Sequence, residues 1–180
     1  MRKVVITTLF SFCFLFSEDI DNMTLIDLYK NYHYSHICSR RWVYINRFVN
    51  KREDLLALVA QSCLKTGNLI PALDVAKMLK NTKEGRKNAT YIATLFLMKK
   101  LIIQVFIDKL NISPIKLPII KDYTLGKIYS LLQKNSYKID GNRLTIKDEE
   151  FSYKILLMKK ENLLIKTFKN GTLIKEETIW

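Results

Sequence analysis

The chain has 180 residues and a formal net charge of +13, with 30 Lys and Arg side chains against 17 Asp and Glu. This length suits one domain with at most a small appendage. The five glycines do not cluster and no Gly-x-Ser-x-Gly motif is present, which excludes a glycine-rich phosphate loop and a nucleophile elbow.

Residues 1–17 have the pattern of a cleavable signal peptide. A positive start at Arg2 and Lys3 precedes an uncharged, apolar run at 4–16, and the small Ser17 comes before two acidic residues. The apolar run is too short for a membrane-spanning helix, which needs roughly 20 residues. We therefore expect cleavage after Ser17 and a periplasmic or secreted mature protein. An uncleaved anchor or a buried helix is the alternative.

Residues 18–110 are predicted to form an array of helical hairpins, because apolar side chains recur there every three or four residues. Asn22 or Thr24 can cap the first helix, whose apolar stripe continues to His36. Gly67 is placed to end a later helix in a left-handed conformation, and Pro71 falls in the first turn of the next one. The further helices are expected at 41–49, 55–66 and 71–79, with a long helix that starts at Asn81 or Thr82 and includes 91–106.

The last third of the chain changes from helical to strand periodicity. Residues 111–120 are a connector, because their two prolines disfavour regular helix. A short amphipathic helix is expected at about 122–134. From Tyr137 onward, apolar and polar residues alternate, and Asn170-Gly171 is a strong hairpin signal. Within 121–180 we expect three or four short antiparallel strands, packed on the preceding helix.

The predicted fold class is therefore α+β: an N-terminal helical hairpin array followed by a small antiparallel β-meander. After loss of Cys13 with the leader, Cys38 and Cys63 remain. An exported chain meets an oxidising compartment, so we expect these two to form a disulfide. Such a bridge is worth about 3–4 kcal/mol in the chain-entropy model. Two separate buried thiols are the alternative.

No catalytic, metal or cofactor site is predicted. His33 and His36 could share a helix face, but Cys38 lies about 200 degrees round the helix from His36, and no acidic cluster adjoins them in sequence. A Cys–His nucleophile is conceivable, but the expected disulfide would remove it. Lys99 and Lys100 interrupt the apolar run at 91–107. They argue against a membrane span there, and their long side chains are expected to reach water.

Two basic groups are candidates for a binding surface. In the first, basic and aromatic residues interleave, which suits a glycan, a peptide carboxylate or a lipid headgroup; the second lies at a predicted helix start, where anions are favoured. An amphipathic helix with its aromatic side in the core is the alternative for the first group. The candidate residues are Arg40, Arg41, Trp42, Tyr44, Arg47, Lys83, Arg86 and Lys87.

Residues 56–79 resemble one tetratricopeptide-type helical hairpin. Small residues and a glycine stand where two such helices cross and turn: Ala60, Gly67 and Ala72. The sequence departs from that pattern at Ala76, where an aromatic residue is usual, and no proline ends the unit. The resemblance covers one unit and implies a helical hairpin that contributes to protein binding. In general character the chain also resembles small exported proteins of AT-rich bacteria.

These features together favour a non-enzymatic interaction protein of the bacterial envelope, with a helical surface for a peptide or another envelope protein. Export argues against a nucleic-acid partner. The first alternative is a peripheral binder of anionic lipid or peptidoglycan, because residues 81–140 hold eleven basic and four acidic side chains. The second alternative is a small hydrolase whose catalytic groups the sequence does not reveal.

Overall fold

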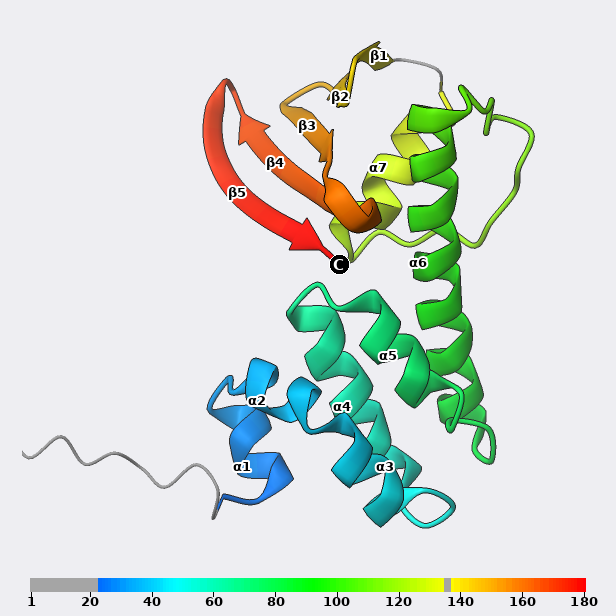
Figure 1. Ribbon diagram of the computed structural model, residues 1–180, viewed down its shortest axis with the longest axis vertical. Coiled ribbons are helices and arrows are strands. Elements are labelled where there is room, and N and C mark those ends of the chain that lie inside the picture. Colours follow the sequence, from blue (N-terminus) through cyan, green and yellow to red (C-terminus); the bar gives the residue numbers. More distant parts are fainter. Residues whose placement is uncertain (1–22, 135–136) are drawn as a thin grey trace, which may run out of the picture.

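The computed structural model describes residues 23–134 and 137–180, so the predicted signal peptide lies outside the described residues. Within this part, helices α1–α7 precede a five-stranded antiparallel sheet, which confirms the α+β class. Figure 1 shows the first five helices at one end of the molecule and the sheet at the other. The long helix α6 runs along both, so it connects the two ends (Figure 1).

Two short helices, α1 (Leu25–Lys30) and α2 (Tyr34–Ser39), replace the single first helix expected from the apolar stripe. The Thr24 hydroxyl caps α1 by accepting from the backbone N–H of Asp27 at 3.2 Å. The helix ends at Lys30, and two residues later Tyr32 has φ of 62°, while the N–H of His33 donates to the carbonyl of Leu28 at 2.9 Å. These contacts form a Schellman motif at the C-terminus of α1. The sequence did not predict it, because a tyrosine takes the position that glycine usually occupies.

The next three helices are α3 (Arg41–Phe48), α4 (Glu53–Lys65) and α5 (Leu69–Ala76), close to their predicted positions. Gly67, in the α4–α5 turn, has φ of +74°, as expected for a left-handed helix end. The turn also touches the end of the sheet: the N–H of Trp180 donates to the carbonyl of Gly67 at 2.9 Å. A Cβ on Gly67 would lie 2.1 Å from the carbonyl oxygen of Thr178, so this contact requires glycine independently of φ.

Helix α6 (Lys83–Ile107) is capped by Thr82, one of the two predicted starting residues, whose Oγ1 accepts from the N–H of Gly85 at 2.9 Å. By length and composition alone, α6 is the one helix among the described residues that could cross a membrane, and 56% of its most apolar window is buried inside the protein. Core helices meet the same criteria, so this is weak evidence for a span.

The two lysines in α6 behave differently from one another. Lys100 reaches the surface and forms an ion pair with Glu161, which lies in the short helix η2 (Lys159–Glu161). Lys99 is only 4% exposed, so the expectation that both side chains reach water is wrong for Lys99. Burial lowers the pKa of Lys99, as does the neighbouring charge of Lys100, while Glu161 acts in the opposite direction.

The predicted connector contains no regular element and is tied to the core by its own side chains. Ile112 and Ile120 are buried, and the carbonyl of Ile115 accepts hydrogen bonds from Tyr129 Oη at 3.1 Å and from Gln133 Nε2 at 2.6 Å. These bonds attach the connector to α7 (Thr124–Leu132) and its C-terminal cap. Figure 1 shows α7 between α6 and the sheet.

The sheet has five strands rather than the three or four predicted, because both short runs around the Gly141 turn pair fully. Its order follows the chain, and every neighbouring pair is antiparallel. The apolar residues of its inner face are buried on the α7 side, as predicted. The strands are β1 (Tyr137–Asp140), β2 (Arg143–Lys147), β3 (Phe151–Leu157), β4 (Leu163–Lys169) and β5 (Thr172–Ile179).

Candidate functional site

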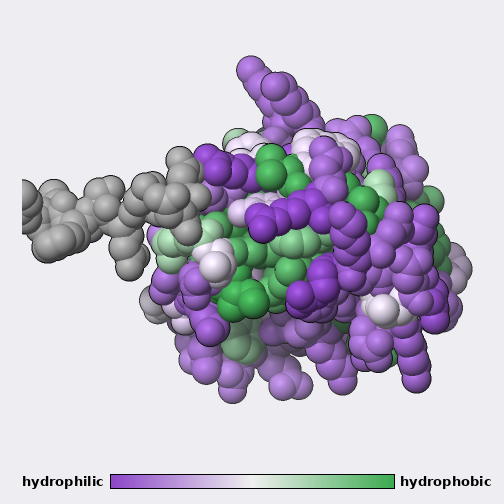
Figure 2. Space-filling model, turned by 90° about the horizontal axis from the view of Figure 1, so that it is seen from below, coloured by the Kyte–Doolittle hydropathy of each residue, from purple (hydrophilic) through white to green (hydrophobic). Residues whose placement is uncertain are grey.

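A groove of about 540 Å³ separates α1 from α3 at the helical end of the molecule. Residues of α1 and its cap form one wall, residues of α3 and the preceding Arg40 form the other, and Leu55 of α4 completes the lining. Figure 2 views this end from below and shows apolar side chains together, with hydrophilic ones around and across them. The lining residues are Met23, Thr24, Leu25, Ile26, Arg40, Val43, Tyr44, Arg47, Phe48 and Leu55.

The groove combines exposed apolar surface with positive charge. Val43 is 61% exposed and Ile26 is 45% exposed, values well above those of core residues. Arg40 and Arg47 add two positive charges, and none of the described lining residues is acidic. A site with these features can bind an apolar side chain and pair with a carboxylate in the same ligand.

Contacts within and behind the groove hold its walls. Within the lining, the Tyr44 and Phe48 rings stack with centroids 6.2 Å apart along α3. Cys38 and Cys63 form the predicted disulfide, with an S–S distance of 2.08 Å, and join α2 to α4. Because α1 leads directly into α2, this bridge also restrains the α1 wall relative to the rest of the helical end.

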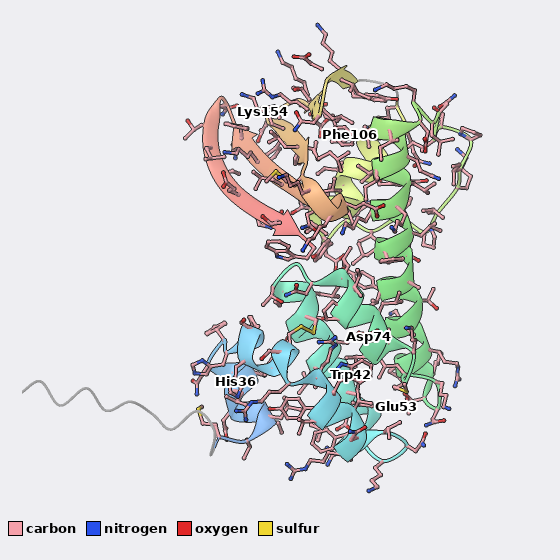
Figure 3. The ribbon with its side chains drawn as sticks, viewed as in Figure 1. His36, Trp42, Glu53, Asp74, Phe106 and Lys154 are labelled. Atoms are coloured by element: carbon pink, nitrogen blue, oxygen red, sulfur yellow. A yellow bond between two sulfur atoms is a disulfide. The ribbon has the colours of Figure 1, made fainter. Side chains whose placement is uncertain are left out.

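The first predicted basic group divides between two faces of α3. Arg40, Tyr44 and Arg47 line the groove, although Tyr44 is mostly buried. Arg41 turns away and its Nε donates to Asp74 Oδ2 of α5 at 3.2 Å, while its guanidinium lies 5.2 Å from the ring centroid of Trp42. Figure 3 shows Trp42 and Asp74 on their neighbouring helices. Arg41 therefore belongs to a contact between α3 and α5, and Trp42, which is 50% exposed, lies outside the groove.

The second predicted group lies at the start of α6 and lines no part of the groove. Arg86 Nη1 donates to the carbonyls of Lys80 and Asn81, each at 3.0 Å, so this arginine stabilises the loop before α6. Lys83 and Lys87 are exposed on the same first turns. The eight predicted residues thus do not meet in one place.

Sequence reasoning missed Glu53, which has the most heavily bonded carboxylate among the described residues. Glu53 is the first residue of α4, a position where the helix dipole alone favours an acid. Its carboxylate also accepts from the backbone N–H groups of Lys80, Asn81 and Thr82 at 2.8, 2.6 and 2.8 Å, and from Thr82 Oγ1 at 2.6 Å. Figure 3 shows Glu53 in the helical part of the molecule, at the start of α4. No local sequence pattern encodes a contact across 27 or more positions.

The pair of Arg41 and Asp74 should contribute measurably to stability, because both side chains are mostly buried, at 22% and 17% exposed. In a double-mutant cycle with Arg41→Gln and Asp74→Asn, we expect a coupling energy of about 1 kcal/mol. The exposed pair of Arg52 and Asp54, at 56% and 62% exposed, is the matched control and should give less than about half of that. Urea denaturation measures both cycles, and equal couplings would contradict the difference in burial.

His33 and His36 lie at the cap and in the body of α2, and Cys38 is in the disulfide. In the part of the chain that the structure describes, no three His, Cys, Asp or Glu side chains are grouped to hold a metal ion. No family model, curated protein or solved structure matches this chain. The tetratricopeptide-type resemblance at 56–79, which α4 and α5 occupy, stays a prediction.

Proposed function

We propose that this protein is a non-enzymatic interaction protein of the bacterial cell envelope, and that its α1–α3 groove binds an acidic, apolar segment of a partner protein. The observation that carries this proposal is the groove itself, where exposed Ile26 and Val43 adjoin exposed Arg47 and no described lining residue is acidic. A partner segment with apolar anchors and acidic flanks is complementary to both properties.

Two observations support an envelope location. The disulfide between Cys38 and Cys63 is of the kind that persists in oxidising compartments. The sequence of 1–17 has the features of a leader that would carry the chain there. Export would also expose the groove to envelope proteins rather than to cytoplasmic ones.

The groove chemistry can be tested with a labelled probe peptide of roughly 15 residues, about four helical turns, with leucines on one face and glutamates elsewhere. Val43→Asp and Arg47→Glu should each weaken its binding about tenfold or more, because they remove apolar contact or reverse a charge in the groove. Fluorescence anisotropy of the probe measures the affinity. Both positions are on the surface of α3, so the variants should fold.

The matched control is Lys87→Glu, which makes the same charge reversal on α6, outside the groove. We expect it to change peptide affinity less than about twofold, since exposed charges beyond about 8 Å are screened at physiological ionic strength. A probe with lysines in place of the glutamates should bind poorly. Equal effects of Lys87→Glu and Arg47→Glu would contradict a groove site. If phosphatidylglycerol vesicles bound instead, with dependence on Lys87, the lipid-binding alternative would replace the proposal.

A further inference from the structure

A second hollow, of about 420 Å³, lies between the start of α7 and the inner face of the sheet, and we call it the α7–sheet cleft. It shares no lining residue with the α1–α3 groove. Charged, hydroxyl and aromatic side chains all contribute to it. The lining residues are Asp122, Thr124, Lys127, Asp148, Phe151, Tyr153, Thr167, Ile174 and Lys175.

The sheet departs from its own pattern at this cleft. Alternation places buried Leu163 and Ile165 on the inner face of β4, and the next inner position is Thr167. Thr167 is only 7% exposed, and its Oγ1 has no hydrogen-bond partner in the described protein. Valine has nearly the same shape and would avoid an unpaired buried hydroxyl. Such local conflicts are expected where a site serves a ligand rather than stability.

The opposite strand carries polar groups on the same face. Lys175 pairs across from Thr167 in the register of β4 and β5, and Glu177 pairs across from Ile165. Lys175 Nζ donates to Thr124 Oγ1 at 3.1 Å and to Glu177 Oε2 at 2.9 Å, which fixes the ammonium group at the edge of the cleft. The inner face of β5 is therefore polar where it borders the cleft.

Two charged side chains of the cleft, Lys127 and Asp148, form no ion pair with another described residue. The other two charged side chains of the cleft have hydrogen-bond partners. Lys175 donates to Thr124 and Glu177, and Asp122 Oδ1 accepts from Tyr91 Oη at 3.2 Å. The lining thus offers two positive and two negative groups. A ligand with one charge of each sign would meet partners for both.

The start of α7 adds a site for the negative group. Tyr123, the N-cap residue, makes no side-chain bond to the helix, because its hydroxyl donates to the carbonyl of Leu64 at 3.0 Å. Thr124, the first residue of this nine-residue helix, lines the cleft. Uncapped N–H groups and the helix dipole favour an anion there, next to Lys127 and Lys175.

We propose that the α7–sheet cleft binds a free amino acid or short peptide with an apolar side chain. Its carboxylate lies between Lys127 and Lys175 at the start of α7, and its ammonium group pairs with Asp148. The apolar side chain packs on Phe151 and Ile174, and the Thr167 hydroxyl gains the partner it lacks. A phosphate would meet two carboxylates, and a neutral sugar would form no ion pair with Lys127 or Asp148.

The cleft also has room for a second residue of a peptide. Asp122, Thr124 and Lys175 line an adjoining hollow of about 310 Å³, together with Tyr91 and Glu177 among others. The Oε1 atom of Glu177 is buried there and has no partner in the described protein. Burial and Asp122 raise the pKa of Tyr91 to about 12, and its hydroxyl donates to Asp122 Oδ1.

The test uses the whole mature protein and three probes: L-leucine, L-phenylalanine and L-leucyl-L-leucine. Backbone-amide NMR shifts should place at least one probe at Thr124, Lys127 and Thr167, with a Kd at or below about 1 mM. N-acetyl-L-leucine and L-leucinamide, which lack the ammonium or the carboxylate, should bind about tenfold or more weakly than L-leucine. No shift at these residues with any probe at about 10 mM would overturn the proposal.

Thr167→Val and Asp148→Asn separate binding from folding. Each substitution should weaken binding of the probe about tenfold or more. Thr167→Val should leave the thermal midpoint equal or higher, because an unpaired buried hydroxyl is removed. The control, Lys154→Gln, changes an exposed residue of β3 that does not line the cleft. Unchanged affinity in Thr167→Val and Asp148→Asn, or an equal loss in Lys154→Gln, would contradict the proposed site.

Discussion

Replacing both Cys38 and Cys63 with alanine is expected to lower the free energy of unfolding by about 3.5 kcal/mol. The bridge closes a loop with a sequence separation of 25, and its removal returns that chain entropy to the unfolded state. The thermal midpoint should fall by about 7–14 °C for a domain of this size. Calorimetry of the native protein and of the double variant measures both quantities.

Reduction of the native protein with a phosphine reagent should reproduce most of this loss without a mutation. It should also weaken the binding of the acidic probe peptide, because α2 would no longer be tied to α4 and the α1 wall of the groove would move more freely. The matched single variants, Cys38→Ala and Cys63→Ala, should each lose as much as the double variant. Alkylation of both thiols in the protein as isolated, before reduction, would contradict the bridge.

Glu53→Gln is expected to destabilise the protein by about 2 to 3 kcal/mol at neutral pH. Four hydrogen bonds to the carboxylate lower the pKa of Glu53 from 4.5 to about 2, with the Thr82 hydroxyl as the largest cause. A shift of this size corresponds to about 3 kcal/mol, which water near the loop reduces. An amide cannot accept all four bonds, so part-buried N–H donors lose their partner. Urea denaturation measures the difference.

The pH dependence gives this prediction a second readout. A carboxyl group whose pKa is lowered on folding stabilises the protein above the unfolded pKa of 4.5, and that stabilisation is lost as the pH falls toward about 2. The stability difference between the native protein and Glu53→Gln should thus be constant above about pH 5.5 and shrink steadily below pH 4.5.

Asp54→Asn is the matched control for Glu53→Gln, because it removes the neighbouring carboxylate from the same helix turn. Asp54 is 62% exposed and bonds only to Arg52 among the described side chains, so we expect a loss below about 1 kcal/mol. Equal losses in the two variants would show that the dipole of α4, rather than the bonds to the 80–82 loop, accounts for the role of Glu53.

The order and type of the elements could be predicted from periodicity and end signals. Thr82 caps α6, Gly67 ends α4 and the Asn170-Gly171 turn joins β4 to β5, each by a local rule that the sequence displays. The cysteine pair could be predicted because two cysteines remain once Cys13 is assigned to the predicted leader. These features depend on neighbouring residues in the sequence or on the number of cysteines, so they could be predicted without a structure.

What could not be predicted depends on distant contacts. Tyr32 takes a left-handed conformation that no propensity favours, Lys99 is buried by the packing of a helix whose composition suggested solvent access, and Glu53 bonds to a loop far along the chain. The basic residues of α3 could be chosen by pattern, yet only tertiary packing decides that Arg47 faces the groove while Arg41 faces α5. The α7–sheet cleft likewise required the register of β4 and β5.

The most direct measurement of groove function replaces Val43 with a photo-crosslinking amino acid in cells that produce the protein. We predict a light-dependent adduct with one envelope protein, with the crosslink in an acidic, apolar segment and with loss of the adduct in Arg47→Glu. The same crosslinker in place of Lys87 should give no such adduct. Absence of an adduct at position 43, or an equal adduct at position 87, would contradict binding at the α1–α3 groove.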